Sequence, residues 1–178
     1  MLDTLITSKT RIKLLLKFFL NSNTVSYLRK LENEFNESSN AIRLELNRFE
    51  KAGLLISYTK GNKKYYKVNT RHPLYNEINK LIIKYTGIDQ ILENVIKKLG
   101  GIKEVYLTGS FCQGIDSNTI EIIIIANNLN IAYLEILIKK AEKIIKRNIK
   151  YFVYNTIEIY KTINKEHYNI LLLWAAEK

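Results

Sequence analysis

Residues 105–126 read VYLTGSFCQGIDSNTIEIIIIA: an apolar segment, a Gly109-Ser110 pair, a short polar link and a second apolar segment. Apolar runs bounded by glycine and polar turn residues are typical of buried strands. We therefore expect strands over residues 102–108 and 119–126, connected through a turn at Gly109-Ser110.

The rest of the second half alternates between helical and strand patterns. We expect an amphipathic helix over residues 131–147, a strand over 149–154, a short helix over 157–163 and an apolar terminal segment over 170–174. Alternating helices and strands indicate a small α/β domain, which we place at residues 102–178.

Gly109, Ser110 and Gly114, between two apolar strands, resemble the minimal nucleotidyltransferases of the DNA polymerase β superfamily. The resemblance implies a Gly-Ser turn that opens a phosphate-binding helix, an Asp-x-Asp pair that binds magnesium on the next strand, and a third acid on a later strand. This chain departs from that pattern, because Thr119-Ile120-Glu121 stands at the Asp-x-Asp position and the strand that contains Lys150 has no acid.

Two-metal phosphoryl transfer requires several carboxylates around the ions. We therefore expect an inactive nucleotidyltransferase-like domain with no catalytic residue, no metal site and no cofactor. Two uses remain for such a domain. It could bind a nucleotide or another phosphate-bearing effector at Gly109 and Ser110, or it could serve only for packing and dimerisation.

The first half has helical periodicity. Ser8 can cap a first helix, a second helix is expected over residues 25–34, and Ser38 or Ser39 can cap a third that ends near Gly53. The residues expected to point inward are Ile12, Leu15, Leu16, Phe19 and Leu20 in the first helix, Val25, Leu28 and Leu31 in the second, and Ile42, Leu46 and Phe49 in the third.

After Gly53 the period changes to two residues, through Leu54, Ile56 and Tyr58. We expect a β-hairpin that returns through residues 65–68, with Gly61-Asn62 supplying the positive φ angles of a tight turn.

The segments SSNAIRLEL (38–46), EKAGLL (50–55) and YYKV (65–68) resemble the winged helix-turn-helix of ArsR-type transcriptional regulators. The resemblance covers about residues 8–70 and implies a DNA-binding domain, which we place at residues 1–72. In such a domain the third helix enters the major groove and the hairpin follows the flanking backbone. The expected DNA-binding residues are Ser38 and Ser39 for a phosphate, Asn40, Arg43 and Asn47 for base edges, and Lys60, Lys63 and Lys64 at the hairpin tip.

Residues 73–101 are expected to form a helical connector, with Pro73 in the first turn of one helix and Asp89 at the start of another. The first helix has Leu74, Ile78, Leu81, Ile82 and Tyr85 at helical spacing. It could be the seam of a homodimer that binds a pseudo-palindrome, or it could pack on its own domain.

The formal net charge of +11 favours a polyanionic partner. Residues 1–89 have 16 Lys and Arg against 8 Asp and Glu, whereas residues 90–178 have 12 against 9. The alternative, a lysine-rich composition imposed by an AT-rich genome, would not require this asymmetry.

The single Cys112 excludes an internal disulfide, and together with two distant histidines it argues against metal sensing. The longest apolar run, residues 122–126, is too short to span a membrane, and the N-terminus has no signal-peptide pattern, so we expect a cytoplasmic protein.

The sequence therefore predicts an α+β protein with an N-terminal winged helix-turn-helix and a small C-terminal nucleotidyltransferase-like domain. We expect a sequence-specific regulator of transcription that binds double-stranded DNA. The alternatives are an active nucleotidyltransferase that uses the winged helix as a substrate adaptor, and an interaction module of the toxin–antitoxin type.

Overall fold

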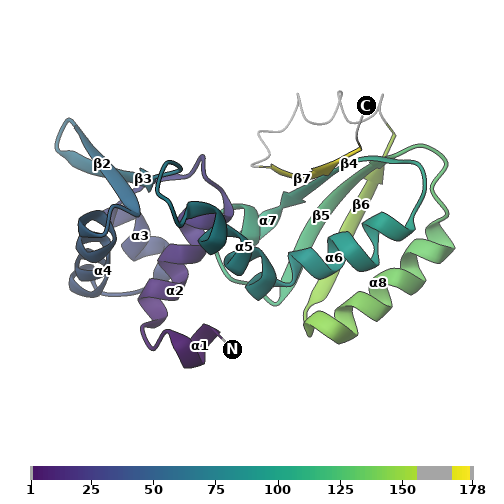
Figure 1. Ribbon diagram of the computed structural model, residues 1–178, viewed down its shortest axis with the longest axis horizontal. Coiled ribbons are helices and arrows are strands. Elements are labelled where there is room, and N and C mark those ends of the chain that lie inside the picture. Colours follow the sequence, from purple (N-terminus) through teal and green to yellow (C-terminus); the bar gives the residue numbers. More distant parts are fainter. Residues whose placement is uncertain (1, 156–169, 177–178) are drawn as a thin grey trace. The chain divides into compact units, whose positions relative to one another are not determined.

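Two separate β-sheets organise this α+β chain (Figure 1). The computed structural model describes residues 2–155 and 170–176. One compact unit consists of residues up to Tyr85 together with Gln113–Asp116, and the other of Thr86–Cys112 with the described residues from Ser117 onward. Of the helices in these described ranges, none combines the length and the apolar character needed to cross a membrane.

In the described part of the first unit, helices come both before and after the β-hairpin along the chain. They are α1 (Leu2–Leu5), α2 (Lys9–Leu15), which continues as the π-helix η1 (Leu16–Leu20), α3 (Leu28–Phe35), α4 (Ser39–Lys51) and α5 (Tyr75–Thr86). Both expected serine caps are confirmed, since the Ser8 Oγ accepts the Arg11 N–H at 3.2 Å and the Ser38 Oγ accepts the Ala41 N–H at 3.3 Å.

The three-stranded sheet of the first unit has the order β1-β3-β2 and is antiparallel throughout. Its strands are β1 (Val25–Tyr27), β2 (Leu55–Lys60) and β3 (Lys63–Val68). The prediction of a helix over residues 25–34 is therefore wrong at its start. Val25 pairs with Lys67 and is 39% exposed, because β3 offers an edge that local periodicity does not reveal.

The hairpin has the predicted two-residue turn, between the paired Lys60 and Lys63. Gly61 has φ 58°, but Asn62 does not have the expected positive φ angle. A positive φ at the first central position alone is the pattern of a type II′ turn. The buried residue of β2 is Leu55, whereas Ile56 and Tyr58 of the predicted alternation are 42% and 45% exposed.

The buried stripe of α4 is confirmed, with one addition. Ile42, Leu46 and Phe49 are buried, and so is Glu45, whose side chain is only 5% exposed. Arg11 of α2 donates to both Glu45 carboxylate oxygens, at 2.8 and 3.2 Å, and Arg48 donates to one of them at 2.8 Å. This ion pair joins α4 to α2.

The residues Gln113–Asp116 complete the first unit. Lys17, which is buried in η1, donates to the Gln113 carbonyl at 2.5 Å and forms an ion pair with Glu34 of α3 at 2.8 Å. Gly114 has φ 73°, and a Cβ atom there would lie 2.9 Å from the Lys17 Cδ. This position therefore requires glycine for both its conformation and the close approach of η1.

The second unit is a four-stranded sheet of order β6-β5-β4-β7. The strands β4 (Ile102–Thr108) and β5 (Thr119–Ala126) have the predicted bounds and pair antiparallel. On the other side of β5, β6 (Asn148–Tyr154) pairs with it in parallel. On the other side of β4, β7 (Leu171–Ala175) pairs with it antiparallel. The predicted strand over residues 149–154 thus begins one residue earlier. The helix expected over residues 157–163 lies outside the described residues.

The helices α6 (Ile88–Asn94) and α8 (Ile131–Ile145) lie on one face of this sheet (Figure 1). A 3-10 turn, η2 (Ile96–Lys98), precedes β4, and α7 (Gly109–Cys112) follows it. On β5, Ile120, Ile122 and Ile124 are fully buried, while Ile123 and Ile125 pack on the other face with Tyr106, Tyr154 and Ile170. A strand buried on both faces explains the unbroken isoleucine run.

The expected connector is divided between the units, with α5 in the first and α6 in the second. Gly87, with φ 85°, precedes α6, so the helix begins before the expected Asp89. The residues at helical spacing in the first part of the connector differ in burial. Ile82 is buried, but Leu74 and Leu81 are 55% and 38% exposed.

We predict that Glu45→Gln lowers the free energy of unfolding at neutral pH by about 1–3 kcal/mol, because Arg11 loses its charged partner at a buried position. Burial acts to raise the pKa of the Glu45 carboxyl, but hydrogen bonds and charge from Arg11 and Arg48 outweigh it, so this pKa is lowered. The stability from this carboxylate is complete above its unfolded-state pKa of about 4.3 and is lost as the pH falls through the lower folded-state pKa.

The measurement is urea unfolding followed by far-ultraviolet circular dichroism at neutral and acidic pH. Glu77→Gln is the control, because Glu77 is exposed on α5 of the same unit and should change stability by less than about 0.5 kcal/mol. Equal losses in the two variants would contradict the role of Glu45.

Candidate functional site

The solvent-facing side of α4 presents the residues that the sequence singled out. Asn40, Arg43 and Asn47 are exposed at spacings of three and four residues, so they share one face of the helix. Among the described residues, Arg43 has neither a hydrogen bond nor an ion pair. Its guanidinium is thus available to an external partner.

The amino end of α4 places Ser38 and Ser39 in exposed positions. Ser38 is the N-cap, and its Oγ already accepts the Ala41 N–H. Its hydroxyl proton remains able to donate, and a helix N-terminus has the partial positive charge that favours an anion. The arrangement is compatible with the predicted phosphate contact.

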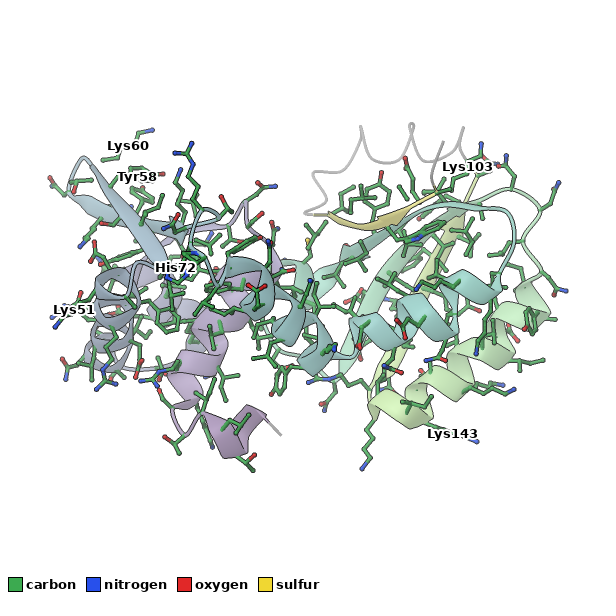
Figure 2. All side chains as sticks on the ribbon, viewed as in Figure 1. Lys51, Tyr58, Lys60, His72, Lys103 and Lys143 are labelled. Carbon is green, nitrogen blue, oxygen red and sulfur yellow. The ribbon has the colours of Figure 1, made fainter. Side chains whose placement is uncertain are left out.

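The three lysines at the hairpin tip lie in different surroundings. Lys60 extends from the end of β2 (Figure 2), and the Lys63 Nζ lies 4.5 Å from the centre of the Tyr27 ring. Lys64, in contrast, forms an ion pair with Glu50 at 2.7 Å. Lys60 and Lys63 therefore offer more net positive charge to a partner than Lys64 does.

The pair of Glu50 and Lys64 shifts both pKa values. Hydrogen bonds from Lys64 and then from Ser57 lower the pKa of the Glu50 carboxyl. The hydrogen bond to Glu50 raises the pKa of the Lys64 ammonium. Both groups therefore stay charged at neutral pH, and each largely neutralises the other.

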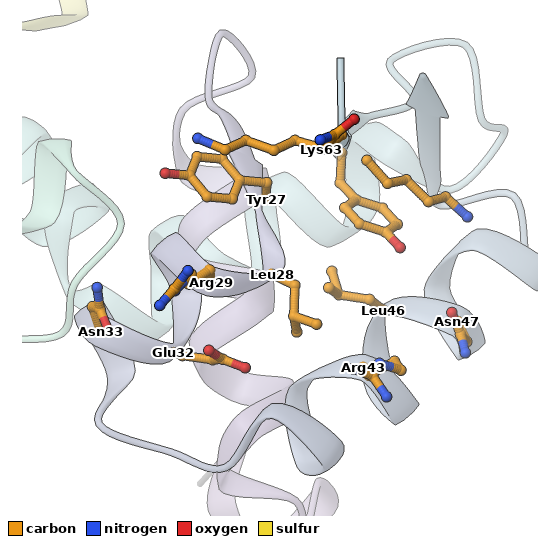
Figure 3. Close-up of a pocket in the computed structure, with 12 residues that line it drawn as sticks. Tyr27, Leu28, Arg29, Glu32, Asn33, Arg43, Leu46, Asn47 and Lys63 are labelled. Carbon is orange, nitrogen blue, oxygen red and sulfur yellow. The ribbon is translucent and has the colours of Figure 1, made fainter. Parts of the chain in front are cut away.

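An open groove of about 1060 Å³ lies between α3, α4 and the hairpin (Figure 3). Leu28 and Leu46 point toward each other at its floor, while Arg43 and Asn47 lie side by side on α4. Its lining residues are Tyr27, Leu28, Arg29, Glu32, Asn33, Arg43, Leu46, Asn47, Asn62, Lys63, Lys64 and Tyr66. Even with Lys64 paired to Glu50, the cations Arg29, Arg43 and Lys63 outnumber the one acid of the lining, Glu32. The groove is therefore basic, as binding of an anionic partner requires.

Among the lining residues that the sequence did not single out are three polar residues of α3, namely Arg29, Glu32 and Asn33. The sequence contained a signal for Arg29, because it is a basic residue in a helix whose inward positions were already identified. Its placement in the same groove as Arg43 depends on how α3 packs against α4, which helical periodicity does not specify.

In the second unit, the Gly109-Ser110 turn opens α7 as expected, and Gly109 has φ 66°. A Cβ atom at Gly109 would lie 2.7 Å from the Glu121 carboxyl carbon, so the Glu121 carboxylate lies directly against the turn. Lys150 lies opposite Glu121 on β6, with its Nζ 3.9 Å from the Glu121 Oε2.

This arrangement disfavours an anion at the turn, because an approaching phosphate would meet the Glu121 carboxylate. It also offers little to a metal ion. Over residues 2–155 and 170–176 there is no group of three or more His, Cys, Asp or Glu side chains that could hold one. The ammonium group of Lys150 lies beside the Glu121 carboxylate, which is the group that would have to bind the metal ion, and its positive charge opposes that binding.

Comparison with known proteins gives only weak similarities. No protein-family model matches the chain, and no curated protein sequence matches it. A crystal structure of an Archaeoglobus fulgidus protein is 17% identical, with a TM-score of 0.38, over 53% of this chain and 99% of that one. A candidate nucleotidyltransferase from Sulfolobus solfataricus is 23% identical, with a TM-score of 0.38, over 57% of this chain and 88% of that one. Such similarity assigns no function, so the proposal below rests on the chain's own geometry.

Proposed function

We propose that the first unit is a winged helix-turn-helix domain and that the chain is a sequence-specific regulator of transcription that binds double-stranded DNA. In this proposal α3 and α4 form the helix-turn-helix, α4 is the recognition helix, and the β2–β3 hairpin is the wing. The observation that carries the proposal is the exposed face of α4 with Asn40, Arg43 and Asn47 beside a lysine-tipped hairpin.

The residues of α4 match the chemistry of base recognition. An arginine can donate two hydrogen bonds to guanine in the major groove, and an asparagine can pair with the donor and acceptor of adenine. Arg43 is therefore assigned to guanine, and Asn40 or Asn47 to adenine. Because Arg43 has no partner within the described part of the chain, it would not have to give up an internal interaction on binding.

The groove and the wing supply the sequence-independent contacts. Arg29 and Lys63 line the groove, and Lys60 extends from the hairpin. In this proposal they contact backbone phosphates, with Ser38 and Ser39 at the amino end of α4. Phosphate contacts fix the register and the affinity, while the base contacts determine the preferred sequence.

The second unit, we propose, does not catalyse nucleotidyl transfer. Phosphoryl transfer with two metal ions needs a cluster of carboxylates. Glu121 instead lies between the Gly109-Ser110 turn and the Lys150 ammonium, and no group of acids that could hold a metal forms around it among the described residues. The unit is then available for packing, for assembly or for a different contact.

We predict that Arg43→Ala weakens binding to the preferred DNA sequence by about 1–3 kcal/mol and has little effect on unrelated sequences, because it removes a base contact. Lys63→Ala should weaken binding to all sequences alike and reduce the slope of log K against log salt by about 0.9, because it removes a phosphate contact. Fluorescence anisotropy with duplexes selected from random sequence measures both effects. If the wild-type chain shows no DNA binding at low salt, the proposal is wrong.

A further prediction concerns Glu50, the acid that pairs with Lys64 at the hairpin. Glu50→Gln should increase the affinity for every duplex, because it releases Lys64 to contact a phosphate and removes a repelling carboxylate. The same anisotropy titration should show a steeper salt dependence, by up to about 0.9 in the slope. Glu77→Gln makes the same charge change on α5 and is the matched control. An unchanged or lower affinity in Glu50→Gln alone would count against a wing at this hairpin.

Incubation with labelled nucleotides and magnesium tests the second unit. We expect no label to be transferred to protein or small-molecule acceptors, since the carboxylates that would hold two ions are absent from the described residues. Transfer that is present in the wild-type chain and abolished in Glu121→Ala would establish the enzyme that this proposal excludes.

A further inference from the structure

A second basic hollow, of about 560 Å³, lies in the second unit at the carboxyl end of α8. Its cations are Lys139, Lys143, Lys146 and Arg147. The three lysines are exposed and recur at spacings of four and three residues, so they follow one side of the helix. Lys143 projects outward from α8 (Figure 2).

The chain holds this hollow in a defined shape. Lys146 adopts the left-handed conformation, with φ 55° and ψ 37°, and its N–H donates to the Glu142 carbonyl at 2.8 Å. Asn148, the first residue of β6, donates its N–H to the Asn118 carbonyl at 2.8 Å, which joins the start of β6 to the loop before β5. The site therefore combines residues from a helix, a strand and a loop.

Two contacts within the second unit help to orient Arg147. Its guanidinium donates to the Ser117 carbonyl and lies 5.2 Å from the centre of the Phe111 ring. A planar guanidinium that is already oriented in this way gives up little conformational freedom when it binds an anion.

The one acid in the lining is already engaged. The Glu142 carboxylate accepts the Ile149 N–H at 2.7 Å. This hydrogen bond ties the acid to the start of β6 rather than to the lysines. The hollow thus has four cations and one acid that is bonded to the backbone.

Helix stability alone does not account for these lysines. Cations near the carboxyl end of a helix interact favourably with its dipole, but this effect falls off within the last turn. Lys139 lies more than one turn before the end of α8 at Ile145. Like charges at spacings of four residues, as at Lys139 and Lys143, destabilise a helix.

We propose that this hollow is a second, sequence-independent contact for the phosphate backbone of DNA. The proposal rests on DNA binding by the first unit. A row of cations on an open surface matches a row of phosphates. The described lining contains no aromatic side chain on which a base could stack, which favours a backbone over an enclosed small nucleotide.

The test compares two double variants of the full chain by anisotropy, with duplexes of several unrelated sequences over a range of salt. Lys139→Gln with Lys143→Gln removes two charges from the hollow. Lys98→Gln with Lys140→Gln removes two exposed charges of the same unit that do not line it. The hollow variant should bind every sequence several-fold more weakly, with a salt slope lower by about 0.9 for each phosphate that is no longer neutralised. The control should keep a slope close to that of the wild type.

The outcomes separate this inference from the function on which it rests. If the wild-type chain does not bind DNA, DNA binding by the first unit is wrong as well. If it binds and Arg43→Ala changes its sequence preference, but the two double variants behave alike, only the second contact is overturned. Titrating the wild-type chain and the hollow variant with inorganic phosphate and with ATP tests whether the hollow binds a small phosphate ligand instead of DNA. A hollow variant that no longer binds ATP but binds DNA as the wild type does would also overturn the proposal.

Discussion

Glu45 lies on the buried side of α4, where Arg11 of α2 and Arg48 hold its carboxylate. A carboxylate in this position would be costly without partners, because burial removes it from water. The two guanidinium groups offset that cost, and the hydrogen bonds from Arg11 fix how α4 lies against α2. Since Arg43 and Asn47 are on the exposed side of the same helix, their orientation depends on this pair.

Acidic residues also determine which cations remain available to a partner. Glu37 pairs with Lys13, Glu34 with Lys17, and Glu50 with Lys64, in addition to the pair at Glu45. Within the described ranges, the groove beside α4 and the hollow on α8 each hold several cations that these acids do not reach. Net charge alone does not reveal this distribution, because it counts paired and unpaired groups alike.

In the second unit, strand pairing and one glycine decide what surrounds the Glu121 carboxylate. The turn at Gly109 has the positive φ that glycine adopts readily. The parallel pairing of β5 with β6 then brings Lys150 opposite Glu121. In this register a lysine, and not a second acid, faces Glu121.

The sequence by itself determined the helices α2 and α4, their serine caps, the two-residue hairpin turn and the bounds of β4 and β5, because each depends on contacts between near neighbours in the chain. The exposed face of α4 followed from its period in the same way. Only the tertiary structure decided that Val25 begins a strand, since its partner Lys67 is far along the chain. The burial of Glu45, the pairing of Lys64 and the basic hollow on α8 likewise depend on which elements pack together, and local sequence patterns do not contain that information.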